Sequence, residues 1–94
     1  MKHGEYIDYY RSGEIWFKCN YLDGEKHDEF ISYYKSGEIS YKVNYLGGRL
    51  HGEYISYYES GNISSNCFYI NGDLVTELEW TSYTRNNKLE LLGL

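Results

Sequence analysis

A 24-residue unit occurs three times in direct succession, at residues 3–26, 27–50 and 51–74. Aligned without gaps, the first two copies share 14 identical positions of 24, and the second and third copies share 13. A chain made of one short unit stacks copies of one supersecondary element, because a single copy cannot bury its own apolar face. The sequence therefore predicts one elongated repeat domain over residues 1–94.

Each unit is expected to be a β-hairpin. Apolar and polar residues alternate along it, and glycine pairs mark the chain reversals. The absence of proline and the presence of thirteen tyrosines and ten glycines are typical of strands and turns. Ser12-Gly13 is predicted to be a two-residue loop between strands 4–10 and 14–22, and Asp23-Gly24 belongs to a longer turn into the next unit. The fold class that follows is all-β, an elongated, twisted, single-layer antiparallel sheet of tandem hairpins.

A two-residue loop at Ser12-Gly13 fixes the faces of the sheet, because a slip of one residue would exchange them. It sets Tyr10 opposite Ile15 and places Trp16 on the polar face. The apolar face then carries one row of side chains from each unit: Tyr6, Tyr10, Ile15, Phe17, Cys19 and Tyr21; Phe30, Tyr34, Ile39, Tyr41, Val43 and Tyr45; Tyr54, Tyr58, Ile63, Ser65, Cys67 and Tyr69.

Residues 75–94 continue the pattern weakly. Glu79-Trp80-Thr81-Ser82-Tyr83 echoes Glu53-Tyr54-Ile55-Ser56-Tyr57 of the third unit. We interpret this segment as a degenerate fourth hairpin that turns at Asn86-Asn87 and caps the array, since terminal repeats are commonly atypical.

The unit reads His-(Gly/Asp)-Glu-(Tyr/Phe)-Ile-x-Tyr-Tyr-x-Ser-Gly-x-Ile, followed by a Tyr-(Leu/Ile) ending and a glycine turn. Over residues 3–74 it resembles the MORN repeat, in the variant common in bacterial and large-virus proteins. The resemblance implies hairpin arrays that act as scaffolds for protein or membrane-lipid association. The same variant occurs in chains labelled as antitoxins of toxin–antitoxin pairs. Related arrays are fused to phosphatidylinositol-phosphate kinases, and nothing in this chain resembles the kinase part.

The histidines and the cysteines are the residues most suited to metal binding or a disulfide, and the repeat is expected to place them too far apart for either. His3, His27 and His51 share one repeat position and should lie ~10 Å from one another, too far for one zinc ion. Cys19 and Cys67 should lie ~19 Å apart, beyond the reach of a disulfide, and are expected to be reduced thiols. The sequence shows no phosphate-binding loop or nucleophile motif. We therefore expect no enzyme activity, no metal and no cofactor.

Charge and hydropathy restrict the partners. The net charge is −5 with acidic and basic residues interleaved, which does not favour nucleic acid and argues against membrane lipid. No run approaches the ~18 apolar residues of a membrane span, and the first residues lack a signal-peptide core. A cytoplasmic location is the simplest expectation.

Aromatic side chains are the features with functional content. The apolar stripe is either half-buried core or a surface for a protein partner, because interfaces are rich in tyrosine. We predict a non-enzymatic protein-interaction module, antitoxin-like, with peripheral phospholipid binding as the alternative. A homodimer through the edge strand 4–10 or through the aromatic face is also considered. The candidate partner-binding residues are Tyr6, Tyr10, Phe30, Tyr34, Tyr54 and Tyr58 on the apolar face, and Tyr9, Trp16, Tyr33 and Tyr57 on the other.

Overall fold

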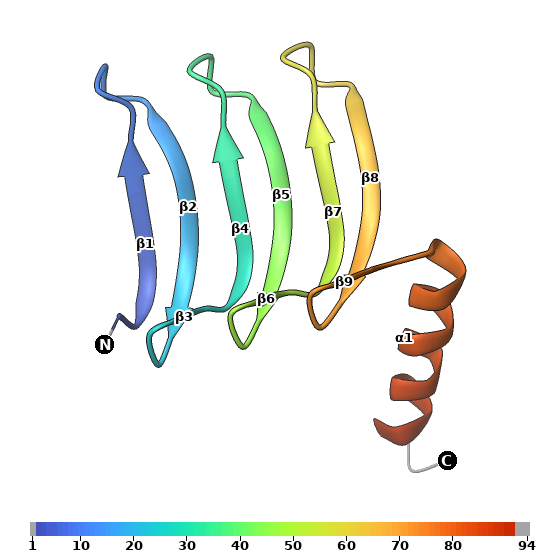
Figure 1. The fold of residues 1–94 in the computed structure, drawn as a ribbon. Coiled ribbons are helices and arrows are strands. Elements are labelled where there is room, and N and C mark those ends of the chain that lie inside the picture. Colours follow the sequence, from blue (N-terminus) through green and yellow to red (C-terminus); the bar gives the residue numbers. More distant parts are fainter. Residues whose placement is uncertain (1, 92–94) are drawn as a thin grey trace.

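The computed structural model describes residues 2–91, with the backbone alone for the last four. Its antiparallel strands form one open layer, in the order β1-β2-β4-β5-β7-β8-β9, with β3 beside β2 and β6 beside β5 (Figure 1). The molecule measures 51 × 35 × 21 Å. The predicted all-β array of hairpins is confirmed. The strands are β1 (Gly4–Tyr9), β2 (Ile15–Leu22), β3 (Glu25–Lys26), β4 (Asp28–Tyr33), β5 (Ile39–Leu46), β6 (Arg49–Leu50), β7 (Gly52–Tyr57), β8 (Ile63–Ile70) and β9 (Asp73–Val75).

The core is a thin line of side chains on one face of the sheet, here called the aromatic face. Cys19 and Val43 are 2% and 1% exposed, and Phe30 is 8% exposed. Cys19 pairs with Tyr6, and Val43 pairs with Phe30, in the register predicted for the middle of each hairpin. Burial raises the pKa of the Cys19 thiol, so this cysteine behaves as a small apolar side chain.

The Ser-Gly turns are wider than predicted. The Tyr10 N–H donates to the Glu14 carbonyl at 2.8 Å, and the Gly13 N–H donates to the Tyr10 carbonyl at 2.9 Å. Gly13 has a φ of 107°, which forms a three-residue loop with a bulge at the glycine. Tyr9 rather than Tyr10 therefore pairs with Ile15. The predicted two-residue loop was wrong because Ser12 does not adopt the positive φ that such a loop needs.

The two-residue loops lie instead between the units. Asp23 and Gly24 have φ of 51° and 84°, the pair of positive values of a type I′ turn. Asp-Gly is a strong sequence signal for that turn, and Gly47-Gly48 and Asn71-Gly72 repeat it with positive φ at both positions. The Gly24, Gly48 and Gly72 N–H groups donate to the carbonyls of Lys2, Lys26 and Leu50 at 2.9, 3.1 and 2.8 Å. Each turn is thus bonded to the residue that precedes its own unit.

Position 2 of the unit requires a positive φ, and the second copy fills it with a non-glycine residue. Gly4 and Gly52 have φ of 92° and 98°, and Asp28 has a φ of 66°. Aspartate tolerates this region at a cost that glycine does not have. We expect Asp28→Gly to raise the free energy of unfolding by about 0.5–1 kcal/mol, measured by urea denaturation. Gly4→Asp is the matched control and should lower it. A loss of stability in Asp28→Gly would mean that the aspartate side chain makes a stabilising contact.

The C-terminal segment is a helix, α1 (Glu77–Leu91), so the predicted fourth hairpin was wrong; residues 92–94 of that prediction lie outside the described residues. The Glu79 N–H donates to Thr76 Oγ1 at 3.1 Å, and the Thr76 N–H donates to Glu79 Oε1 at 3.0 Å. This reciprocal capping box starts the helix. The hydrogen bonds from Thr76 lower the pKa of the Glu79 carboxyl. The sequence signal was Thr76-x-x-Glu79.

Trp80 attaches α1 to the last hairpin. Its ring stacks on Phe68 of β8 with centroids 5.9 Å apart, and it meets the His51 ring edge to face at 5.6 Å. A Cβ atom on Gly52 would lie 3.7 Å from the Trp80 ring, already in van der Waals contact. The helix thus sits at the foot of the last hairpin (Figure 1).

Tyrosine hydroxyls connect consecutive units at the Ser-Gly end of the sheet. Tyr10 Oη donates to the Tyr33 carbonyl at 2.5 Å, and Tyr34 Oη donates to the Tyr57 carbonyl at 2.6 Å. Tyr58 holds the same position in the third unit, is 57% exposed and has no following unit within residues 2–91.

This difference gives a matched pair of variants. Tyr34→Phe keeps the ring and removes one inter-unit hydrogen bond, so we expect it to lower the free energy of unfolding by about 1 kcal/mol. Tyr58→Phe should change it by less than about 0.5 kcal/mol. Urea denaturation of both variants measures the difference, and equal effects would contradict the role of the Tyr34 hydroxyl.

Candidate functional site

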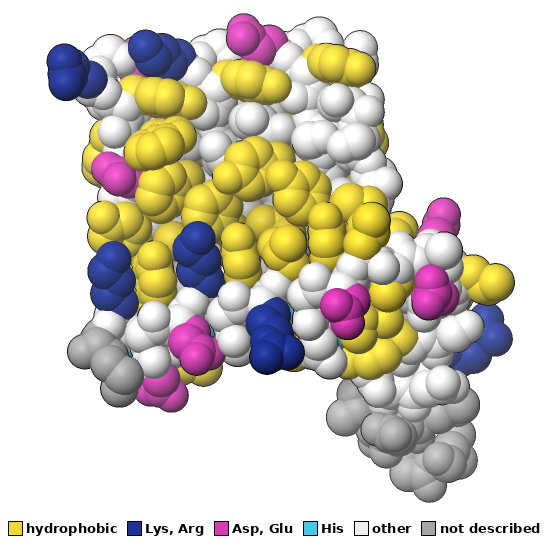
Figure 2. All heavy atoms as spheres, viewed as in Figure 1, with side chains coloured by type: hydrophobic (Ala, Val, Ile, Leu, Met, Phe, Trp, Pro, Cys, Tyr) yellow, Lys and Arg dark blue, Asp and Glu magenta, His cyan; other side chains and the backbone are white. Residues whose placement is uncertain are grey.

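Five rings form an aromatic ladder across the first five long strands, from Tyr6 through Phe17, Phe30 and Tyr41 to Tyr54. Successive centroids lie 6.1, 5.1, 5.9 and 5.7 Å apart, and the last three contacts are nearly parallel, with interplanar angles of 16°, 9° and 9°. The ladder exists because the first two units each supply a ring at the same two positions of the hairpin, one on each strand, and the third unit supplies Tyr54. It spreads as a continuous hydrophobic band over one face of the molecule (Figure 2).

The ladder ends in the third hairpin. Ser65 of β8 stands where the first two units have Phe17 and Tyr41. Its hydroxyl lies 2.6 Å from that of Ser56 on β7. A polar pair therefore replaces the next ring, and the aromatic face stops at Tyr54 and its tilted neighbour Tyr69, 6.2 Å away.

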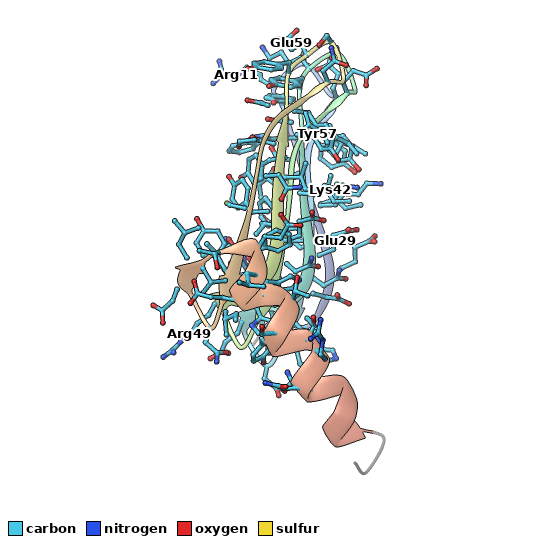
Figure 3. All side chains as sticks on the ribbon, turned by 90° about the vertical axis from the view of Figure 1, so that its right-hand side faces the viewer. Arg11, Glu29, Lys42, Arg49, Tyr57 and Glu59 are labelled. Carbon is cyan, nitrogen blue, oxygen red and sulfur yellow. The ribbon has the colours of Figure 1, made fainter. Side chains whose placement is uncertain are left out.

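Two lysine side chains lie over rings of the aromatic face. Lys2 Nζ lies 4.6 Å from the centroid of Tyr6, and Lys26 Nζ lies 5.0 Å from Phe30 and 5.2 Å from Tyr45. Contacts of this length are cation–π interactions. The basic side chains appear between the hydrophobic ones in Figure 2, and Figure 3 places Arg49 on the same side. The site therefore combines flat apolar surface with fixed positive charge.

The structure brings the predicted aromatic-face residues together in part. Tyr6, Phe30 and Tyr54 are in the ladder. Tyr10 and Tyr34 are occupied by their inter-unit hydrogen bonds. Tyr58 is exposed beyond the end of the ladder. Sequence reasoning placed Phe17 and Tyr41 on this face without counting them as site residues, although they complete the continuous stack.

Trp16 was predicted to lie on the opposite face, and the structure places it elsewhere. Its ring centroid lies 5.1 Å from that of Phe17 and 6.1 Å from that of Tyr10, so it borders the aromatic face. The bulge after Ile15 makes Trp16 the extra residue of β2, and a bulge redirects a side chain. Trp16 is 45% exposed.

The opposite face holds the remaining candidates among charged side chains. Tyr9 is exposed, and Tyr33 is half-buried with Lys18 Nζ 5.9 Å from its ring. Figure 3 shows Tyr57 on this side, together with Glu29 and Lys42. No stack of rings joins Tyr9, Tyr33 and Tyr57 within the described part of the chain, so this face offers separate side chains rather than a continuous surface.

A groove of about 500 Å³, which the sequence did not predict, lies between α1 and the sheet. His51, Glu53, Phe68 and Trp80 are among its lining residues. His51 Nδ1 accepts the Asn71 N–H at 3.2 Å, so this histidine supports the neighbouring turn. The groove was missed because it depends on a helix where a hairpin was expected.

Among residues 2–87, whose side chains the structure describes, no group of three His, Cys, Asp or Glu side chains is placed to hold a metal ion. Cys19 and Cys67 are free thiols. Within residues 2–91, no helix has the length and apolar character needed to span a membrane.

Burial of the aromatic face affects its phenols. Desolvation raises the pKa of Tyr41, Tyr45 and Tyr54 above the usual value of 10.0. A raised folded-state pKa favours the neutral, folded form, so its stabilising effect is complete below pH 10.0 and is lost as the pH rises through the folded-state value.

We therefore expect the urea midpoint to fall above about pH 10. The double variant Tyr41→Phe, Tyr45→Phe keeps both rings and should show a smaller fall over the same range. Measurement of tryptophan fluorescence in urea at a series of pH values tests this. An identical pH dependence in the two proteins would exclude these phenols as its cause.

The three units correspond to a known repeat. A family model described as the MORN repeat variant matches residues 2–23, 29–46 and 50–71, one match in each unit. Neither a curated protein nor a solved structure matches the chain. The repeat of this family is a non-catalytic module.

Proposed function

The chain belongs to the MORN repeat variant family, and we propose that it is a protein-interaction module whose aromatic face binds a segment of another protein. The observation that carries this proposal is the aromatic ladder, a continuous row of rings on an open single-layer sheet. Tyr6 at its end is 37% exposed. Aromatic side chains held in fixed positions bind partners at a low cost in conformational entropy.

The charges beside the ladder favour a particular chemistry in the partner. Lys2 and Lys26 are held over rings, although the whole chain has a net charge of −5. A complementary segment would carry apolar or aromatic side chains for the ladder and carboxylates for the lysines. In its specific form the proposal is antitoxin-like: the partner is a toxin neutralised in the cytoplasm.

A matched pair of lysine variants tests the proposal. Lys26, the last residue of the first unit, lies on the aromatic face, and Lys42 of the second unit lies on the opposite face (Figure 3). Proteins captured from the native cell by the unmodified chain should be retained by Lys42→Glu and lost by Lys26→Glu. Capture that is lost only with Lys42→Glu would move the site to the opposite face, and the absence of any stable partner would refute the proposal.

Peripheral phospholipid binding is the second candidate, favoured by the position of Lys2, Lys26 and Arg49 on one side of the molecule. Basic side chains near a membrane surface each contribute ~1 kcal/mol with anionic lipid. Flotation with vesicles of phosphatidylcholine and phosphatidylserine, using the same two variants, separates the candidates. Binding to vesicles that Lys26→Glu removes would support the lipid function. Kinase activity is not part of either proposal.

A further inference from the structure

The first strand has a hydrogen-bonded neighbour on one side only within the described part of the chain (Figure 1). The direction of its backbone groups follows from the register. Tyr10 bonds to Glu14, and Asp8, Tyr6 and Gly4 then pair with β2 beyond the bulge. Antiparallel pairs alternate between hydrogen-bonded and non-hydrogen-bonded, so the intervening odd-numbered residues direct their N–H and C=O groups outward. These residues are Glu5, Ile7 and Tyr9.

In the other two units this edge is paired. Ile31 and Ile55 hold the position of Ile7, and they pair with Lys18 and Lys42 of the preceding hairpin. The backbone of the unit is therefore built to receive a strand at this edge. In the first unit, the outward backbone groups of Ile7 have no strand beside them in the described part of the chain.

The other end of the array is covered only where β9 pairs with Phe68–Ile70, and the rest of β8 has no strand beside it on this side in the described part of the chain. In β9, Val75 pairs with Phe68 at the place where His27 bonds to Asn20 in the interior of the array, so Val75 already occupies the first position of a fourth unit. Trp80 of α1 stacks beside it on Phe68. Head-to-tail addition of another chain would need this space. Because the two ends differ, addition of a second chain head to tail is disfavoured. Pairing of β1 with β1 of a second copy instead gives a closed dimer.

We propose that β1 pairs antiparallel with β1 of a second copy, about a two-fold axis that passes between the two Tyr6 residues. Glu5 of each copy then lies opposite Ile7 of the other, and four outward N–H groups bond to four carbonyls. The Tyr9 N–H is not needed, because it already donates to Asp8 Oδ1 at 2.8 Å.

Two other registers that keep the aromatic faces on one side are less favourable. A pair centred on Ile7 would use the Tyr9 N–H and would have to displace the Asp8 carboxylate. A pair centred on Glu5 would oppose two carboxylates across the strands, which is destabilising. The register centred on Tyr6 avoids both.

The consequence is a doubled ladder. Tyr6 would face its copy in a non-hydrogen-bonded pair, where side chains lie closest. Each Tyr6 already stacks on Phe17 at 6.1 Å, so the two aromatic ladders would join into one surface. The inference concerns the edge of the sheet and does not rest on the identity of the partner proposed for its face.

Solution mass and cross-linking test the inference on the full chain. Sedimentation equilibrium should give twice the chain mass of 11.2 kDa. Ile7→Pro removes an outward N–H without removing a bond to β2, and it should halve the mass, whereas Ile7→Ala should leave the mass doubled.

A disulfide provides the second measurement, which does not depend on the folding of the proline variant. Cys19 and Cys67 are first replaced by valine, the residue at position 43 of the second unit. In this background Tyr6→Cys should form a disulfide-linked dimer on oxidation, and Tyr54→Cys, at the equivalent interior position, should not. A monomer without the Tyr6→Cys cross-link overturns the proposal. So does a dimer that keeps its mass in Ile7→Pro without cross-linking, because it would use another surface.

Discussion

Replacement of Phe30 by alanine should lower the free energy of unfolding by about 3 kcal/mol. Phe30 is 8% exposed and stacks between Phe17 and Tyr41, with ring centroids 5.1 and 5.9 Å away. Its loss interrupts the ladder in the middle unit and uncovers Val43, because a single-layer sheet has no second layer to fill the gap. For a small domain with a total stability of ~5–15 kcal/mol, this is a large fraction. Urea denaturation followed by tryptophan fluorescence measures it.

Tyr6→Ala is the matched control, because Tyr6 holds the position of Phe30 in the first unit. It stacks on one ladder ring and is 37% exposed, so its truncation should cost about 1–1.5 kcal/mol. The comparison is made at a dilution at which the chain is monomeric. Equal losses in the two variants would mean that the ladder contributes as separate side chains and that the central ring has no special role.

Trp80→Ala should detach α1 from the sheet. An isolated helix of about 15 residues is marginal in water, and Trp80 supplies the stacking on Phe68 and the edge contact with His51. We expect hydrogen exchange of the helical amides to accelerate by at least ~10-fold and the helical circular dichroism at 222 nm to fall. The amides of β2, which belongs to the first hairpin and does not line the groove beside the helix, should keep their protection.

Leu78→Ala is the control on the same helix, since Leu78 is exposed and alanine is a good helix former. It should leave the exchange of α1 unchanged. Retention of slow exchange in Trp80→Ala would show that the capping box of Thr76 and Glu79 stabilises the helix without tertiary contacts. Loss of protection throughout the sheet would show that the helix is an integral part of the repeat fold.

The candidate site could be predicted from the sequence where it depends on alternation within a strand. The pairing of Tyr6 with Cys19 and of Phe30 with Val43 follows from a period of two, and the structure has both pairs. The position of Trp16 could not be predicted in the same way, because the turn is one residue longer than expected and a bulge at Trp16 restores the predicted register beyond it. Short turns with similar sequences differ by one residue in length, and one residue changes the direction of every side chain near the turn.

The C-terminal segment shows a second reason for failure. Its resemblance to the third unit favoured a hairpin, although Thr76-x-x-Glu79 is a helix start that local chemistry alone supports. The contacts of Trp80 with Phe68 and His51 could not be inferred from either signal, because they join residues that are distant in the chain.

By itself, the sequence determined the repeat, the hairpin of each unit, the single-layer antiparallel sheet and the face on which the aromatic side chains gather. These features follow from the alternation of apolar and polar residues and from glycine at the turns, which are local properties that recur in each unit. The tertiary structure alone decided that Phe17 and Tyr41 link the rings into one ladder, that lysines lie over it, and that a helix packs on Phe68 at one end while β1 stays open at the other. These contacts join residues of different units, so they depend on how closely the units pack against one another, which the local pattern of one unit does not specify.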